Sequence, residues 1–122
     1  MVDTLELNHV ALHVADIDKS VAFYRDLIGL KPIPRPAFTF PGAWFAIGTR
    51  QELHLIGERE QPVASGHRAG HFAMQVQSVK TVEQELKQKG VEMHGPKQRP
   101  DGAWQVFIKD PDGHWMEFCE LG

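Results

Sequence analysis

Two short runs of the chain, residues 7–14 and 71–76, alternate between apolar positions and other positions. A period of two is typical of a β-strand that covers one face with a packed layer. Both runs are therefore predicted to be strands whose apolar faces pack against a helix. The opposite faces carry His9, Ala11 and His13 in the first strand and His71, Ala73 and Gln75 in the second.

Each predicted strand is followed by apolar residues at helical spacing. Residues 19–28 form one such segment, and Val79, Val82 and Leu86 share one helical face in the second half of the chain. Residues that favour helix starts and ends stand next to both segments. These are Asp16 or Asp18 and Ser78 at the starts, and Gly29 and Gly90 at the ends.

Three further strands are predicted after each helix. They cover residues 31–33, 43–48 and 52–56 in the first half, and residues 92–95, 104–109 and 115–120 in the second. The order βαβββ thus occurs twice, and His9 aligns with His71 when the halves are superposed. We predict an α+β fold in a single domain, residues 1–122. Its two modules, about residues 5–58 and about residues 68–120, are related by a pseudo-twofold axis.

The last strand of each module also has a polar face. Glu52, His54 and Ile56 point away from the apolar side of one strand, and Trp115, Glu117 and Cys119 do so in the other. If the pseudo-twofold axis closes the two sheets into a cleft, four metal-binding side chains converge there. They are His9, His54, His71 and Glu117. Three imidazoles and one carboxylate suit a divalent first-row metal such as Zn, Mn, Fe, Co or Ni.

Composition removes several other classes of function. The 122 residues carry 13 Lys and Arg against 16 Asp and Glu, a formal charge of −3, without a basic cluster for nucleic acid. The single cysteine, Cys119, excludes an intrachain disulfide and a zinc site built on several thiolates. No apolar run approaches the ~18 residues expected of a membrane span. We expect a soluble, cytoplasmic protein without a nucleic-acid or membrane partner.

Three stretches of the sequence resemble the vicinal oxygen chelate superfamily, which includes glyoxalase I, extradiol dioxygenases and bleomycin resistance proteins. They are LNHVALHVADIDKSVAFYRDLIGL near the start, GHFAMQV in the middle and DPDGHWMEF at the end. The resemblance implies paired βαβββ modules around a cleft, usually in a homodimer. It also implies one metal ligand from the first and fourth strands of each module, which gives His9, His54, His71 and Glu117.

The resemblance has one departure, at His54. Glyoxalase I usually carries Glu at this position and the related epimerase carries Gln, so this chain has one carboxylate fewer to act as a base. Glu117 is the expected catalytic residue, serving as ligand and base in turn. We expect a glyoxalase-like lyase or isomerase, in which the metal chelates two neighbouring oxygens of a small oxygen-rich metabolite.

Two other functions remain open at this point. An extradiol-type Fe(II) dioxygenase uses two His and one Glu, which His9, His71 and Glu117 match. A non-catalytic protein that binds a drug or metabolite, as bleomycin resistance proteins do, typically lacks the ligands found here.

The remaining candidates belong to substrate binding. Arg35 and Trp44 are expected at the mouth of the cleft, where Arg35 suits a carboxylate or phosphate; the alternative is a surface loop. His13 and Gln75 either orient a metal ligand or line the cleft. The other three histidines lie in loop-like segments and are expected to be solvated: His67, His94 and His114.

Overall fold

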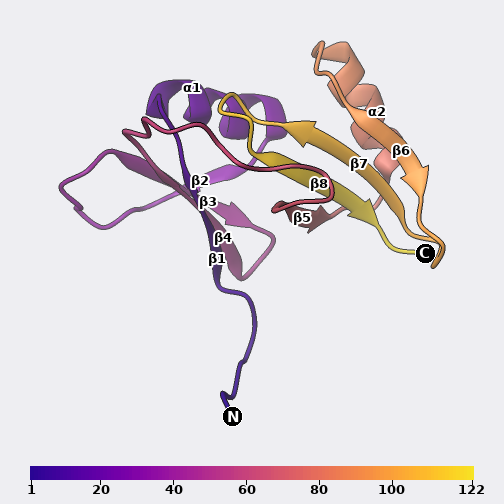
Figure 1. Cartoon of the computed structure of the whole chain (residues 1–122), viewed down its shortest axis with the longest axis horizontal. Coiled ribbons are helices and arrows are strands. Elements are labelled where there is room, and N and C mark those ends of the chain that lie inside the picture. Colours follow the sequence, from indigo (N-terminus) through magenta and orange to yellow (C-terminus); the bar gives the residue numbers. More distant parts are fainter. The chain divides into compact units, whose positions relative to one another are not determined.

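Eight strands form two four-stranded sheets, and helical segments accompany each sheet, which confirms the predicted α+β class. The computed structural model describes all 122 residues. Its internal contacts divide the chain into a first unit, residues 1–61, and a second unit, residues 62–122. Figure 1 draws the elements of both units, which are described separately below.

The elements of the two units follow the same order. The first unit contains β1 (His9–His13), α1 (Ile17–Ala22), the π-helical turn η1 (Phe23–Ile28), β2 (Lys31–Ile33), β3 (Gly42–Ile47) and β4 (Gln51–Ile56). The second contains β5 (Phe72–Gln75), α2 (Val79–Gln88), β6 (His94–Gln98), β7 (Trp104–Lys109) and β8 (Trp115–Glu120).

The two sheets also share one topology. The strand orders are β1-β4-β3-β2 and β5-β8-β7-β6. In each sheet the first strand is parallel to the last, and the other neighbours are antiparallel. The sequence repeat is therefore a repeat of structure, and it sets residues from both ends of each unit side by side.

The first helical segment begins and ends where the sequence indicates. The Asp16 carboxylate accepts a hydrogen bond from the backbone N–H of Lys19, and Gly29 ends the π-helical turn with a φ of 88°. Tyr24, on η1, is fully buried and lies 6.3 Å from the ring of Phe45 on β3. The helical segment thus covers the apolar face of the first sheet.

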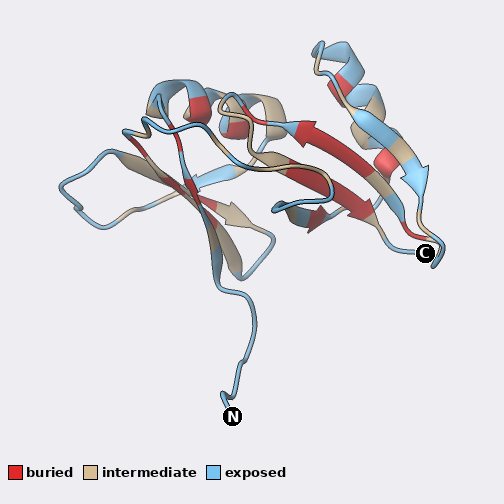
Figure 2. Cartoon of the chain, in the orientation of Figure 1, coloured by how far each residue is buried: buried red, intermediate tan, exposed pale blue.

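The second unit has its core on α2, β7 and β8, where buried residues are concentrated (Figure 2). Ser78 caps α2 through its hydroxyl, which accepts from the N–H of Thr81 at 3.2 Å. The buried Asp110 carboxylate accepts hydrogen bonds from the N–H groups of Asp112 and His114, both at 2.9 Å. This turn fixes the β7–β8 hairpin and hence the register in which Phe107 faces Glu117.

One predicted strand is displaced along the chain. Residues 92–95 were expected to be extended, whereas β6 begins at His94 and continues to Gln98. Gly95 and Pro96 normally interrupt a strand, but β6 is an edge strand, where proline is tolerated because one side needs no hydrogen bonds. The β6–β7 register shifts between His94 and Lys97, and Gly95 has a φ of 101°.

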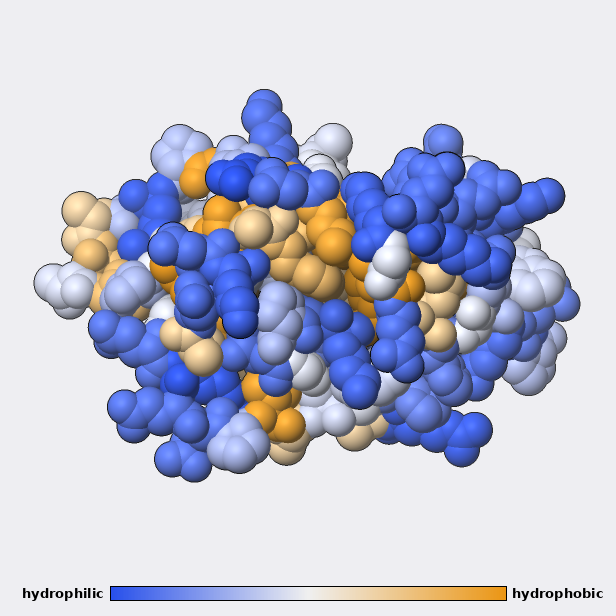
Figure 3. Space-filling model, turned by 90° about the horizontal axis from the view of Figure 1, so that it is seen from above, coloured by the Kyte–Doolittle hydropathy of each residue, from blue (hydrophilic) through white to orange (hydrophobic).

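None of the helices is both long enough and apolar enough to cross a bilayer. On the face drawn in Figure 3, hydrophilic residues make up most of the surface, with apolar groups between them. Phe38 and Phe40 are among the large apolar side chains that are exposed, at 46% and 39%.

Replacing Leu55 by Ala should destabilise the protein by about 2–5 kcal/mol, because this fully buried leucine leaves a cavity against β1 and β3. Urea unfolding followed by circular dichroism measures the change. Leu5→Ala is the control, since Leu5 is 97% exposed, and its stability should match the wild type. Equal midpoints for the two variants would contradict the assigned core.

Candidate functional site

The first unit brings His9 and His54 together. The parallel pairing of β1 and β4 sets Ala11 opposite His54 and His9 opposite Glu52. As a result the imidazoles of His9 and His54 stack with their centroids 4.1 Å apart and their planes at 19°. Two of the four predicted metal ligands therefore lie in contact on one face of this sheet.

The ring of His54 is held from two directions. Trp44, its antiparallel neighbour on β3, stacks on it. The ring centroids are 3.8 Å apart, and the ring planes are within 3° of parallel. On the edge of the ring, Nε2 lies 2.8 Å from Glu52 Oε1. Because an ionised carboxylate only accepts hydrogen bonds, Nε2 carries the hydrogen and Nδ1 keeps a free lone pair.

Sequence analysis placed Glu52 on the same strand face as His54 but gave it no role. The sequence contains the signal for this role, since residues two apart on a strand share a face.

The ring of His9 is held by its neighbour in the chain. Its Nδ1 donates to the side-chain oxygen of Asn8 at 2.8 Å, which leaves Nε2 with the lone pair.

The second unit brings His71 and Glu117 together. The parallel pairing of β5 and β8 sets Ala73 opposite Glu117, in the same register that sets Ala11 opposite His54. His71 Nε2 lies 3.1 Å from Glu117 Oε1. His54 and Glu117 thus occupy equivalent positions in the two sheets.

The Glu117 carboxylate is almost fully buried, with 5% of its side chain exposed. Its other oxygen, Oε2, accepts a hydrogen bond from the side-chain amide of Gln105 at 3.0 Å. The ring of Phe107 meets the ring of His71 edge-on at 5.4 Å. Gln105 and Phe107 on β7 therefore support this pair, and neither had been predicted to do so.

The surroundings of Glu117 also affect Cys119. Burial raises the pKa of the Cys119 thiol, and the negative charge of Glu117 raises it further. Both effects favour the protonated form of this buried thiol.

Neither unit by itself groups three or more His, Cys, Asp or Glu side chains that could hold a metal ion. Each unit contributes two of the four predicted ligands. The convergence of both pairs on one ion therefore stays a prediction.

Three of the four predicted substrate-binding residues contact other parts of the first unit. The Arg35 guanidinium donates to the carbonyl of Phe40 at 2.8 Å and lies 5.0 Å from the rings of both Phe38 and Phe40. His13 Nε2 donates to the carbonyl of Gly57 at 2.9 Å. The remaining two are Trp44, in the stack with His54, and Gln75, exposed on β5.

Two histidines expected to be solvated, His67 and His114, are half-buried. His67 is half-buried, and its ring lies 4.5 Å from that of His94 and 5.5 Å from that of Trp115. Burial lowers the pKa of His67, and the proximity of His94 lowers it further. His94 belongs to β6 and not to a loop. Local sequence patterns do not indicate this aromatic group, because His67 lies before β5 and meets His94 and Trp115 only through packing within the unit.

Changing Gln105 to Ala should destabilise the protein by about 1–3 kcal/mol, because the buried Glu117 carboxylate loses a donor. Urea unfolding at pH 7 measures the loss. The control is Gln84→Ala on the exposed side of α2, expected within about 0.5 kcal/mol of wild type. Equal losses in the two variants would show that Gln105 does not support Glu117.

Comparisons with known proteins match this chain to one superfamily. The sequence model of the Glyoxalase/Bleomycin resistance protein/Dioxygenase superfamily matches residues 6–118. The protein named Glyoxylase I 4 from Arabidopsis thaliana is 31% identical over 121 residues, covering 93% of this chain and 69% of that protein.

Two further relatives carry the name of the same enzyme, lactoylglutathione lyase. A lactoylglutathione lyase of Arabidopsis thaliana is 26% identical over 132 residues; the match covers 98% of this chain but only 46% of that protein, so this chain spans less than half of its length. The crystal structure of a lactoylglutathione lyase from Agrobacterium tumefaciens superposes with a TM-score of 0.79 at 24% identity. That match covers 97% of this chain and 95% of the other, and it shows a shared fold.

Proposed function

Because the chain belongs to the Glyoxalase/Bleomycin resistance protein/Dioxygenase superfamily, we propose that it is a metal-dependent, glyoxalase-like lyase or isomerase. Its substrate is a small oxygen-rich metabolite. The lactoylglutathione lyases among its relatives support a lyase, and the two ligand pairs support the use of a metal.

The single observation that carries this proposal is the contact between His71 and Glu117. His71 Nδ1 faces the carbonyl oxygen of Ala69 at 3.1 Å, so this nitrogen carries a hydrogen. Nε2 lies 3.1 Å from Glu117 Oε1. This contact places an imidazole nitrogen beside a carboxylate oxygen, two kinds of atom that bind divalent first-row metals.

The available lone pairs form a consistent donor set. His9 offers Nε2, His54 offers Nδ1, and His71 Nε2 and Glu117 Oε1 complete the set. Imidazole nitrogens with one carboxylate oxygen suit Zn, Mn, Ni, Co or Fe. Each imidazole keeps its second nitrogen in a hydrogen bond, an arrangement typical of metal-bound histidines. We also propose that the protein is a homodimer. The His9–His54 pair and the His71–Glu117 pair then bind the same ion, either within one chain or between two copies.

A divalent ion in this set would polarise two neighbouring oxygens of the substrate and stabilise negative charge that develops on them. The carboxylate of Glu117 accepts the proton from the carbon next to the substrate carbonyl and returns it to the adjacent carbon. Gln105 and His71 keep this carboxylate oriented, and its burial keeps water away. Glu52, the nearest other carboxylate on the His54 strand, is already bonded to His54 and serves to orient it.

Replacing His71 by Ala should weaken binding of a divalent metal by at least ~100-fold, because changing even a residue that only supports a ligand costs about 10- to 100-fold. Elemental analysis after anaerobic purification and titration with Zn²⁺ or Ni²⁺ measure occupancy. His114→Ala is the matched control, because His114 lies in the turn before β8 and outside the donor set.

Full occupancy in the His71→Ala variant would mean that the metal lies elsewhere. Bound iron together with oxygen uptake on catechols would replace the lyase by the dioxygenase. Failure of the wild type to bind any divalent metal would favour a protein that binds a drug or metabolite without catalysis.

A further inference from the structure

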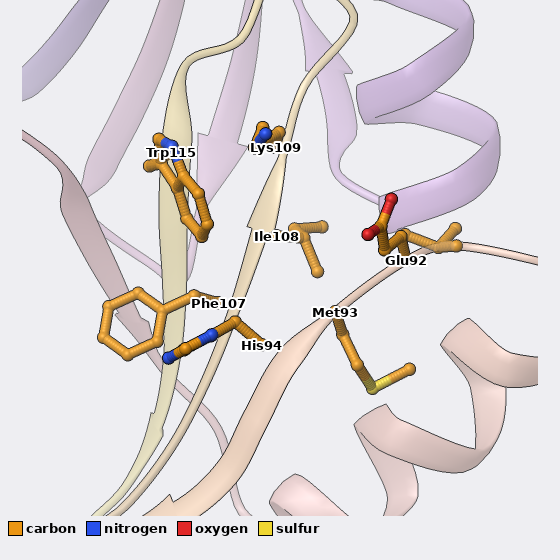
Figure 4. A pocket seen from close by; sticks show the side chains of 8 residues that line it. Glu92, Met93, His94, Phe107, Ile108, Lys109 and Trp115 are labelled. Atoms are coloured by element: carbon orange, nitrogen blue, oxygen red, sulfur yellow. The ribbon is translucent and has the colours of Figure 1, made fainter. Parts of the chain in front are cut away.

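The second unit contains a hollow of about 310 Å³ at the edge of its sheet (Figure 4). Three kinds of side chain line it: aromatic rings, aliphatic groups and two opposite charges. The lining residues are Val91, Glu92, Met93, His94, Phe107, Ile108, Lys109 and Trp115.

The hollow exists because β6 starts late. Pairing between β6 and β7 begins where His94 faces Phe107, so residues 91–93 turn away from β7 instead of continuing the ladder. The side of β7 beside Ile108 and Lys109 is left without a neighbouring strand. Met93 and Ile108 approach each other across this gap and form an apolar wall (Figure 4).

The aromatic side of the hollow adjoins the His71–Glu117 pair. Residues directly opposite in antiparallel strands share a face, so His94, Phe107 and Glu117 lie on one face, as do Lys109 and Trp115. Residues two apart on a strand also share a face, which joins these two sets. The centroid of the Phe107 ring lies 5.4 Å from that of His71 and 6.1 Å from that of His94. Phe107 therefore connects the hollow to the His71–Glu117 pair.

The hollow also presents a positive charge that the protein does not neutralise. The Lys109 ammonium lies 5.2 Å from the centroid of the Trp115 ring, a cation–π contact. The Lys109 ammonium takes part in no ion pair within the chain. Glu92, on the opposite wall, supplies one negative charge, which disfavours a ligand that is anionic at both ends.

We propose that this hollow binds the substrate of the adjoining site through a flat unsaturated or aromatic group that carries a single carboxylate. The flat group packs against the rings of Trp115, His94 and Phe107, and the carboxylate pairs with the Lys109 ammonium. This assignment rests on the proposed function only for calling the ligand a substrate, because the binding contacts do not include the metal.

The rings favour an aromatic group over an aliphatic one of similar size. Paired aromatic rings gain about 0.5–1.5 kcal/mol beyond the area they bury, which corresponds to roughly two- to tenfold in affinity. His67 extends the aromatic wall behind His94, at a ring separation of 4.5 Å. A partly exposed ion pair with Lys109 adds up to about fivefold.

Nuclear magnetic resonance titration of the ¹⁵N-labelled full chain tests the proposal, with the protein as purified and again after treatment with EDTA. Phenylacetate is the probe, cyclohexylacetate lacks the aromatic ring, and 2-phenylethanol lacks the charge. Phenylacetate should shift the Trp115 indole N–H and the backbone signals of His94 and Lys109. It should bind at least about twofold more tightly than cyclohexylacetate and about fivefold more tightly than 2-phenylethanol.

The Lys109→Gln variant should weaken phenylacetate about fivefold and leave 2-phenylethanol unchanged. Lys31→Gln, which removes an exposed lysine from β2 of the first unit, should change neither. The dispersion of the spectrum shows whether each variant is folded. Equal affinity of wild type and Lys109→Gln for phenylacetate, or shifts that miss Trp115 and His94, would overturn the proposal.

The same titration separates this inference from the proposed function. If phenylacetate shifts Trp115 but the wild type takes up neither Zn²⁺ nor Ni²⁺ when it is titrated with these ions, the hollow stands and the proposed metal-dependent activity fails. If metal binds through His71 but phenylacetate does not shift Trp115, the assignment of the hollow fails alone.

Discussion

The parallel pairing between the first and last strand of each unit is the constraint on which the site depends. Residues more than forty positions apart become neighbours only through the β1–β4 and β5–β8 ladders. Both ladders have the same register relative to the first-strand histidine, with Ala11 opposite His54 and Ala73 opposite Glu117. A slip by one residue would turn His54 or Glu117 into the apolar core and separate each pair.

The two pairs differ in their chemistry although they share a position. His54 is fixed by flat stacking on Trp44 and by the Glu52 carboxylate, and His9 lies against its other face. Glu117 is buried, lies against His71 Nε2 and accepts a hydrogen bond from Gln105. The first unit therefore offers two neutral nitrogen donors, whereas the second offers a nitrogen and the single carboxylate. In the proposed mechanism this asymmetry places proton transfer in the second unit, which also contains the hollow beside Phe107.

Much of this arrangement was predictable, because it follows from local rules. Alternation along the strands located His9, His54, His71 and Glu117 on polar faces, and Asp16, Ser78 and Gly29 marked helix boundaries that the structure contains. The supporting residues were not predictable in the same way. Gln105 and Phe107 come from a neighbouring strand, so their roles depend on the β7–β8 register. The end of β6 was placed too early because Gly95 and Pro96 oppose a strand locally, while pairing with β7 at the sheet edge continues the strand to Gln98.

In the proposed centre, one metal ion binds three imidazoles whose second nitrogens donate to Asn8, Glu52 and the carbonyl of Ala69. Proton NMR of the cobalt(II)-loaded protein tests it most directly, since a paramagnetic ion strongly shifts the N–H protons of the imidazoles that bind it. We expect three shifted signals that exchange with solvent, with a different one lost in each of His9→Gln, His54→Gln and His71→Gln. Shifted signals that survive all three substitutions, or the absence of any such signal, would contradict the account.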